Sequence, residues 1–316
     1  MPSPPPLSTA HTSVERAIQV RELYSIGERG DYLKYSNNTY ENIECCIKLD
    51  NKVSRTFKEW RGNRQGHVRA DGHYKAYINP CLDAVNMANL GFNIGPICVG
   101  ATCCADDTYV LSDTPSRLQS SLNIVNHYAK RYRVIFNADK TKAVVTGSKL
   151  DMTFYKETKP WILNEERIRV VDDNDHLGLL VSGWDEEQKN VDQKIVQCRN
   201  SLFAMLGPAY AYKCKISPST QVHLWQTYNL PVLMSGLAAL PVRPAVASSL
   251  TSFHHKILRG FLRLSKSSPV PCLYFLLGEL PVENKLHMEN LSLFYTIWSN
   301  PATKIFKILK YILMMS

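Results

Sequence analysis

The clearest periodic pattern in the chain is an apolar stripe between residues 114 and 132. Its members follow one another at intervals of four, three, four and three residues: Leu118, Leu122, Val125, Ala129 and Tyr132. This spacing places them on one face of an α-helix. Thr114 is a good N-cap residue, and Pro115 suits the first turn. The pattern therefore predicts a helix whose stripe belongs to a hydrophobic core.

Short apolar runs predict β-strands elsewhere in the first half. Residues 101–104 and 108–111 form two such runs, which places Asp106 and Asp107 at the tip of a hairpin. Asp50 and Asn51 predict a turn between two further strands. The remaining predicted strands and hairpins cover residues 43–49, 53–56, 134–136, 143–146 and 161–171.

The second half of the chain is predicted to be helical. One apolar face, expected to stop at Gly207-Pro208, consists of Val191, Ile195, Cys198, Leu202 and Leu206. Further helices are expected after residue 217, separated by prolines at positions 231, 241, 244, 269, 271 and 281. Helices are also predicted within residues 14–40 and 79–88. Strands followed by helices predict an α+β fold, and 316 residues with 45% hydrophobic content suffice for two domains.

Adjacent carboxylates between apolar runs are the main candidate for chemistry. Asp106 and Asp107 repel each other unless a proton or a cation neutralises them. Mg²⁺ takes oxygen ligands and often shares them between carboxylates and substrate phosphates. A solvated turn is the plain alternative for such a pair. The second acidic cluster, residues 172–175, is expected to be a solvated turn because it lacks the pattern of a calcium loop.

Four blocks, in this order, resemble the reverse transcriptase domain of a non-LTR (LINE-type) retrotransposon polyprotein. The first is Arg61-Gly62-Asn63-Arg64-Gln65-Gly66 and the second is Cys104-Ala105-Asp106-Asp107. The third runs from Asn137 to Thr141, and the fourth is His176-Leu177-Gly178. Singly each block is modest, and together they cover most of the chain.

The resemblance implies RNA-directed DNA polymerase activity by two-metal nucleotidyl transfer, with Mg²⁺ or Mn²⁺ as cofactor. Asp106 and Asp107 would be catalytic metal ligands, and Lys140 would serve the triphosphate. The partners implied are an RNA template, a DNA primer and dNTPs. The implied substrate- and template-binding positions are Arg61, Arg64, Gln65, Gly66, Asn137, Thr141, Leu177 and Gly178.

The resemblance also implies a right-hand polymerase palm, an antiparallel sheet with packed helices, followed by a helical thumb and a C-terminal helical region. Residues 1–13, with four prolines in the first six positions, are expected to be a disordered tail. Residues 14–182 would be partial fingers and palm. Residues 183–316 would be the thumb and C-terminal region.

Three departures from the family pattern predict weak or absent catalysis. The strand carrying the first metal-binding aspartate has no counterpart, because no acidic residue precedes Glu15. The sequence therefore predicts an N-terminal truncation before that motif. Ala70-Asp71 replaces Ser-Pro, and Cys104 replaces an aromatic residue. The alternative function is a catalytically silent RNA- and DNA-binding remnant, and a third possibility is a scaffold that binds no nucleic acid.

Basic residues are clustered, which favours contact with phosphates. The net charge is +9, yet residues 52–75 and 129–149 each have a local balance of +5. Residues 243–266 contain five basic residues and no acidic one. Such clustering is typical of a nucleic-acid groove, with solvated surface as the alternative. His254-His255, in the third window, are expected to be at the surface or near phosphates.

The nine cysteines show no spacing typical of a zinc site, so no structural zinc is expected. Neighbouring pairs such as Cys45-Cys46 and Cys103-Cys104 are expected to be buried thiols. The sequence shows neither a secretory signal nor an apolar segment long enough to span a bilayer. The protein is therefore expected to be intracellular, in cytoplasm or nucleus, with no membrane partner.

Overall fold

The computed structural model describes residues 13–41, 43–63, 66–105, 107–134, 136, 139–147, 149–211 and 216–315. The chain divides into two compact units. Unit 1 contains the described residues up to Ala143 together with Thr153–Val171, and unit 2 contains Val144–Met152 together with the described residues from Asp172 onward. Helices and small sheets occur together, which confirms the α+β class.

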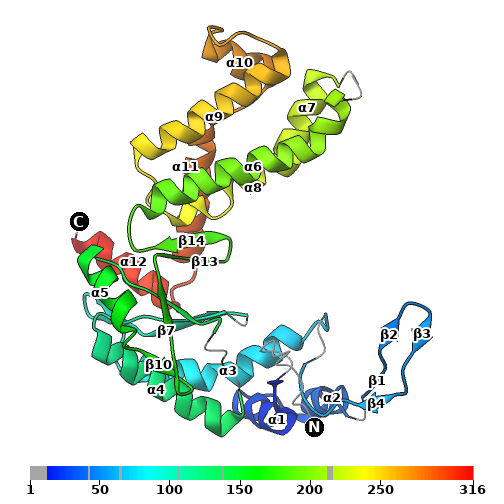
Figure 1. Ribbon diagram of the computed structural model, residues 1–316, viewed down its shortest axis with the longest axis vertical. Coiled ribbons are helices and arrows are strands. Elements are labelled where there is room, and N and C mark those ends of the chain that lie inside the picture. The colour runs from blue at the N-terminus through cyan, green and yellow to red at the C-terminus, as the bar shows by residue number, and fades with distance from the viewer. Residues whose placement is uncertain are drawn as a thin grey trace. The chain divides into compact units, whose positions relative to one another are not determined.

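Unit 1 combines helices with short two-stranded sheets (Figure 1). Its helices are α1 (Arg16–Ser25), α2 (Gly30–Asn38), α3 (Ala70–Met87) and α4 (Pro115–Tyr132). Its antiparallel pairs are β1 (Glu44–Cys45) with β4 (Phe57–Lys58), β2 (Lys48–Leu49) with β3 (Lys52–Val53), β5 (Phe92–Ile94) with β6 (Ile97–Val99), β7 (Ala101–Cys104) with β8 (Asp107–Val110), and β10 (Ile162–Leu163) with β11 (Glu166–Arg167). Strand β12 (Arg169–Val171) pairs with β9 (Lys142–Val144), and α5 (Lys149–Thr158) crosses the boundary between the units.

The predicted amphipathic helix is confirmed as α4. The side chain of Thr114 accepts a hydrogen bond from the backbone N–H of Arg117 at 3.4 Å, and Pro115 begins the helix. Of the predicted stripe, Leu118 is half-buried and the other four residues are buried. The helix ends where Arg133 adopts a left-handed conformation with φ 57°. Local capping and periodicity therefore determine this element.

Helix α3 begins nine residues before the predicted start at residue 79. Gly72 and Pro80 both lower the local helix propensity, so the sequence does not predict the first half of this helix. Burial outweighs that cost, because α3 packs against α1 and α4. Its buried face consists mainly of Tyr74, Tyr77, Ile78, Cys81 and Val85.

The predicted turn at Asp50-Asn51 is confirmed between β2 and β3, with Asp50 at φ 52°. Figure 1 shows this pair extending the ribbon that β1 and β4 begin. The prediction for residues 134–136 was wrong at Val134 and Phe136, neither of which lies in a strand. Val134 is instead buried, with its N–H bonded to the carbonyl of Ala129 as part of the C-terminal end of α4.

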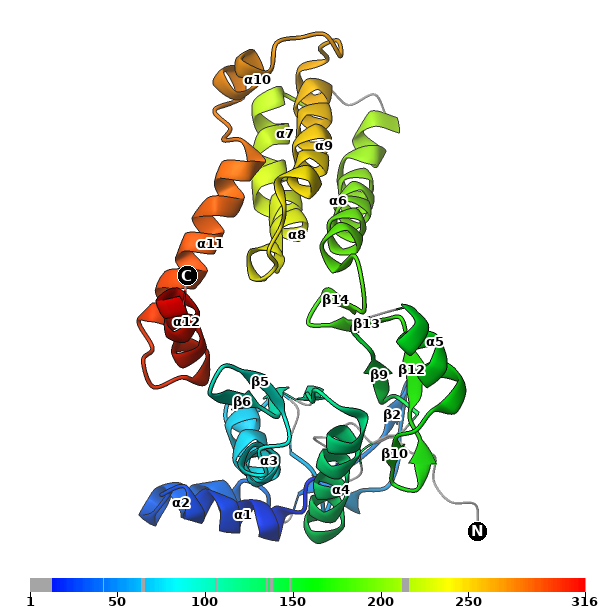
Figure 2. The same cartoon turned by 90° about the vertical axis from the view of Figure 1, so that its left-hand side faces the viewer.

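Unit 2 consists mainly of helices, together with the hairpin of β13 (Asp173–His176) and β14 (Leu179–Ser182). Its helices are α6 (Glu186–Ala211), α7 (Pro218–Leu224), a π-helix (Trp225–Asn229), α8 (Leu230–Met234), a 3-10 helix (Leu237–Ala239), α9 (Pro244–Leu262), α10 (Val270–Leu277), α11 (Val282–Trp298) and α12 (Lys304–Met315). Helices α6 and α9 lie alongside each other, as Figure 2 shows. Prolines stand at or next to the start of α9, α10 and α11, as the sequence pattern predicts. The separation predicted at Pro231 was wrong, because α7, the π-helix and α8 follow one another without a break from Pro218 to Met234.

Two further predictions for this unit were wrong. Residues 172–175 were expected to form a turn, but Asp173–His176 is a strand whose acidic side chains have local partners, such as the hydroxyl of Ser182 for Asp173 at 2.6 Å. Helix α6 was expected to stop at Gly207-Pro208 but continues to Ala211. A proline removes one hydrogen bond without necessarily ending a helix, and here α6 also packs along α8 and α9.

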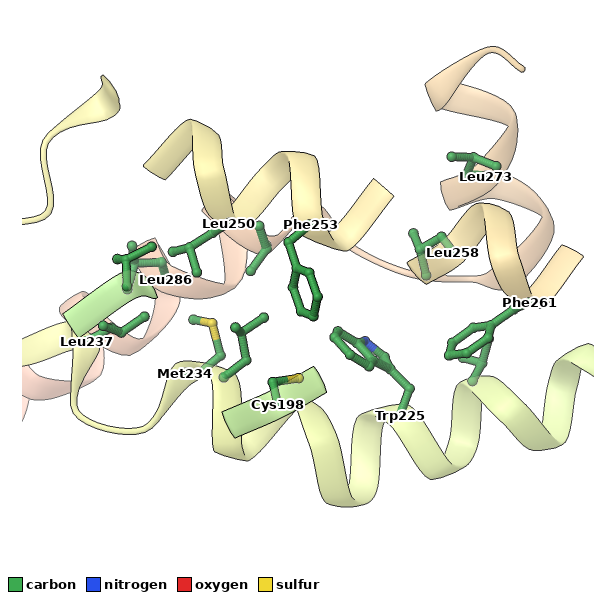
Figure 3. Close-up of a cluster of buried hydrophobic side chains, with 14 of the residues drawn as sticks. Cys198, Trp225, Met234, Leu237, Leu250, Phe253, Leu258, Phe261, Leu273 and Leu286 are labelled. Atoms are coloured by element: carbon green, nitrogen blue, oxygen red, sulfur yellow. The ribbon is translucent and has the colours of Figure 1, made fainter. Parts of the chain in front are cut away.

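The core of unit 2 is built around Trp225, which is fully buried (Figure 3). Its ring lies 6.4 Å from those of both Phe253 and Phe261, and it stacks on His254 at 5.6 Å. His254 is itself fully buried, so the surface position expected for it was wrong. His254 lies on the apolar face of α9 and therefore packs in the core. Its neighbour His255 is partly buried, and the His255 Nε2 lies 2.8 Å from the hydroxyl oxygen of Tyr274.

The expectation of buried thiols holds only in part. Cys81 and Cys198 are buried, whereas Cys46 and Cys104 are exposed. Adjacent residues of an extended segment point to opposite faces, so at most one of each neighbouring pair faces inward. No helix in the described part of the chain combines the length and the apolarity that crossing a membrane requires.

Candidate functional site

The β7–β8 hairpin places Asp107 at the start of β8. Cys104 pairs with Asp107 across the hairpin, and Ala105 stands in the two-residue turn with φ 53°. Asp106 lies outside the described residues. The Asp107 side chain is exposed and has no ion-pair or hydrogen-bond partner among the described residues. Its carboxylate is therefore available to a cation or a polar ligand.

Asn86 on α3 holds the first strand of this hairpin. Its Oδ1 accepts the N–H groups of Gly100 and Ala101 at 3.1 and 3.2 Å, and its Nδ2 donates to the carbonyl of Ala101 at 3.1 Å. Gly100 allows this approach, because a Cβ there would lie 3.1 Å from the carbonyl oxygen of Val85. One side chain therefore sets the position of β7, whose end leads to Asp106 and Asp107.

Replacing Asn86 with alanine is expected to destabilise unit 1 by about 2–4 kcal/mol, because three partly buried backbone groups lose their partner. Urea denaturation followed by circular dichroism measures the loss. Asn123→Ala, at an exposed position on α4 with a side-chain partner only, is the matched control and should cost less than about 1 kcal/mol. Equal losses for the two variants would contradict the role given to Asn86.

The first block of the resemblance is held by Arg16, which the sequence analysis did not single out. The Arg16 guanidinium donates to four backbone carbonyls, those of Tyr40, Glu59, Arg61 and Gly62, at 3.1, 2.5, 3.1 and 3.0 Å. The N–H of Gly62 donates to the carbonyl of Val14 at 2.8 Å. Arg16 thus fixes the chain that enters the block.

Within that block, the structure describes Arg61, Gly62, Asn63 and Gly66, while Arg64 and Gln65 lie outside the described residues. The Arg61 side chain is half-exposed and pairs with Glu15 at 3.4 Å. Gly66 has φ +82°, a conformation that favours glycine, and a Cβ there would meet nothing within 4 Å. The backbone is thus open to a ligand at Gly66.

The third block is described only in part. Asp139 and Lys140 form an exposed turn, as predicted for Lys140, and Thr141 leads into β9. Asn137 lies outside the described residues. The structure shows no distance that would join Lys140 to Asp107, so their use in one site remains a prediction.

The fourth block forms the turn between β13 and β14. His176 pairs with Leu179, and the two turn residues Leu177 and Gly178 have φ values of 51° and 77°. Two consecutive left-handed residues are typical of a type I′ hairpin turn. Both turn residues are exposed.

Buried tyrosines join helices α1, α3 and α4. The Tyr128 hydroxyl donates to the carbonyl of Tyr77, and the Tyr77 hydroxyl donates to the carbonyl of Tyr132. Burial raises the pKa of Tyr128 far above its ordinary value, so its hydroxyl stays protonated. The Tyr132 hydroxyl donates to Glu22 of α1 at 3.2 Å, which links α1, α3 and α4.

No cluster of three or more His, Cys, Asp or Glu side chains that could hold a metal occurs in the described part of the chain. Asp107 contributes one unpaired carboxylate, and Asp106 follows the turn residue Ala105 directly in the sequence. Two such carboxylates fit the oxygen-rich ligand set of Mg²⁺. The residues present thus suit a divalent cation only if Asp106 takes part.

Comparison with known protein families shows to which family the chain belongs. A family model described as reverse transcriptase (RNA-dependent DNA polymerase) matches residues 7–190. The chain belongs to the reverse transcriptase family. The match includes all four blocks and ends within α6. No curated protein matches the chain significantly.

Membership of the reverse transcriptase family implies a nucleic-acid template and primer, dNTP substrates and divalent metals. Sequence reasoning found the blocks but missed Arg16 and Asn86. Both act on backbone groups far away in the sequence, and no local pattern marks such contacts. In the sequence Asn86 is only a polar residue between Val85 and Met87, which does not indicate its role.

Proposed function

We propose that this chain is the reverse transcriptase domain of a non-LTR retrotransposon protein, acting by two-metal nucleotidyl transfer. The observation that carries the proposal is the β7–β8 hairpin. It carries the unpaired carboxylate of Asp107 beside its turn, is held by Asn86, and lies within the reverse transcriptase match. Residues 14–182 would supply fingers and palm, and residues 183–316 the thumb and C-terminal region.

In this proposal Asp106 and Asp107 hold the divalent cation. When bound, that cation stabilises negative charge on the attacking and leaving oxygens. Lys140 offsets charge on the departing pyrophosphate. The backbone at Gly66, with Arg61, Arg64 and Gln65, lies along template and nucleotide, while Asn137 and Thr141 flank the triphosphate. Leu177 and Gly178 support the primer end.

Catalysis by this chain alone is expected to be weak, because a third carboxylate is hard to find near its start. Glu15, the first acidic residue, faces Arg61 and Arg133 at 3.4 and 3.3 Å. Glu22 pairs with Arg21 at 2.8 Å, and Glu28 pairs with Arg69 at 3.4 Å. Asp31, the fourth acidic residue of this stretch, lies 3.7 Å from Lys34. Each of these four carboxylates has a cation as partner, which opposes a role as the third metal ligand.

Primer extension on an RNA template with Mg²⁺ or Mn²⁺ tests the proposal. We expect Asp106→Ala and Asp107→Ala to lower any synthesis by at least ~100-fold, or about 2.7 kcal/mol in barrier. Asp83→Ala, which removes an exposed carboxylate from α3, is the control and should leave the rate unchanged. A third form, with an aspartate-bearing strand added before residue 14, should be more active than the unmodified chain.

A second candidate function is nucleic-acid binding without catalysis, and the three basic windows favour it. It predicts salt-dependent binding to an RNA–DNA hybrid that survives Asp106→Ala. DNA synthesis that is unaffected by Asp106→Ala and Asp107→Ala would contradict the catalytic proposal. Absence of synthesis from every form, with hybrid binding retained, would favour the binding function.

A further inference from the structure

Helix α6 holds the β13–β14 hairpin through a row of side chains. Asn190 forms two hydrogen bonds with the backbone of Leu180, each 2.7 Å long. The Asn190 Nδ2 donates to the Leu180 carbonyl oxygen, and the Leu180 N–H donates to the Asn190 Oδ1. Lys189 pairs with Asp173 at 2.7 Å, and Gln193 donates to Asp175 at 3.3 Å. The turn at Leu177-Gly178 is therefore fixed relative to the first half of α6.

Lys194 follows directly in this row but has no such partner. Its side chain makes no ion pair or hydrogen bond with any described residue, although the residue is only 4% exposed. Burial lowers the pKa of its ammonium group from the ordinary lysine value. A partly buried charge without a counter-charge is unfavourable, and proteins usually pair such groups. Lys189, five residues earlier on the same helix, has such a partner in Asp173.

The ammonium of Lys194 lies directly beneath the turn. A Cβ built on Gly178 would be 3.8 Å from Lys194 Nζ, and Gly178 itself is exposed. Because glycine carries no side chain, nothing of Gly178 beyond its backbone covers the ammonium on that side. An anion bound at the turn could therefore contact the Lys194 ammonium, which has no counter-charge among the described residues.

We propose that Lys194 binds a backbone phosphate of the nucleic-acid strand that rests on the Leu177-Gly178 turn. This inference rests on the proposed function, which supplies the strand. The phosphate provides the counter-charge that the fold omits, and a partly desolvated ammonium binds it more strongly than a fully hydrated one does. The position of the lysine, set by α6, would fix the register of the strand without reading its bases.

A purely structural role is the competing explanation, since the methylene stem of Lys194 also packs in the interior. Lys194→Met distinguishes the binding role from the structural role, because methionine keeps an unbranched side chain and removes the charge. If the charge serves only binding, its removal should leave the thermal midpoint of unfolding unchanged or raise it. If the charge serves the fold, the midpoint should fall.

Binding of a fluorescent RNA–DNA hybrid at several salt concentrations tests the proposal. We expect Lys194→Met to bind about tenfold more weakly and to reduce the slope of log affinity against log salt by about one. Lys307→Met, which removes an exposed lysine from α12, should change neither quantity. Unchanged affinity and slope for Lys194→Met would overturn the proposal, and so would a large fall in its thermal midpoint.

Thermal unfolding with inorganic phosphate as the probe keeps this inference separate from the proposed function. A ligand that binds only the folded state raises the midpoint. Phosphate also stabilises proteins generally, so the difference between variants is the readout. A smaller response from Lys194→Met than from Lys307→Met supports an anion site even if the chain binds no hybrid. Equal responses, together with equal hybrid binding, overturn it.

Discussion

Acidification below pH 6.5 is expected to destabilise unit 2 more than any single surface change, and His254 is the reason. This side chain is fully buried, and burial lowers its pKa from the ordinary value of 6.5 to about 3. Both ring nitrogens lack hydrogen-bond partners among the described residues. The imidazole therefore stays neutral in the folded state while it binds a proton in the unfolded chain.

The sign follows from that difference in proton binding. Above pH 6.5 both states are neutral and His254 adds no pH dependence; below it the unfolded state gains a proton and the free energy of unfolding falls by about 1.4 kcal/mol per pH unit. The loss reaches roughly 3 kcal/mol near pH 4.5 and ends near the folded pKa of about 3. Lys285 and His255 add to the lowering, and the ring faces Trp225 and Tyr274.

Urea denaturation at pH 7.5 and at pH 4.5, followed by circular dichroism, measures this effect. His254→Leu should remove most of the extra sensitivity to acid, because leucine cannot bind a proton. His223→Leu, which replaces an exposed histidine on α7, should retain the sensitivity of the unmodified chain. An unchanged acid response in His254→Leu would show that other groups cause it.

Arg16→Met is expected to lower the free energy of unfolding of unit 1 by about 3–5 kcal/mol, because four carbonyls and Glu59 lose one shared donor. The loss falls on the segment that leads into Arg61 and Gly66. We therefore expect template binding to weaken as well, even though Arg16 itself need not touch nucleic acid.

Two measurements check the role of Arg16. Urea denaturation gives the stability, and hydrogen exchange at the Gly62 amide reports whether its bond to Val14 opens. Arg16→Lys keeps the charge but not the planar set of donors, so it should recover only part of the loss. Arg167→Met, which removes an exposed arginine bonded to Thr158, should cost less than about 1 kcal/mol. If the Gly62 amide is equally protected in Arg16→Met, the role given to Arg16 is wrong.

Elements determined by neighbouring residues could be predicted from the sequence. The cap at Thr114, the stripe along α4 and the turn at Asp50 all depend on residues a few positions apart. The early start of α3 and the continuation of α6 through Gly207-Pro208 could not be predicted. There, packing against distant helices outweighs a low local propensity. His254 was misplaced for the same reason, because only the packing of α9 shows which of two adjacent histidines faces inward.

In the candidate site too, features that depend on neighbouring residues could be predicted and those that depend on distant contacts could not. Asp107 and the turn at Leu177-Gly178 were found because adjacent residues carry their signal. Arg16 and Asn86 were missed because each acts on backbone from another segment. Lys194 was missed because only the folded chain shows that it lies beside Gly178 of another segment. Their residue types are ordinary ones for a helix, and only the folded chain shows what each side chain meets.

The chain crosses between its two units three times, after Ala143, after Met152 and after Val171. Val144–Met152 is therefore separated in sequence from the rest of unit 2 by residues that belong to unit 1. During synthesis, unit 1 is incomplete until Val171 has left the ribosome, and Val144–Met152 must wait for the helices made after it. Unit 1 is thus expected to complete its folding first, while Val144–Met152 stays without its partners until the rest of unit 2 has been synthesised.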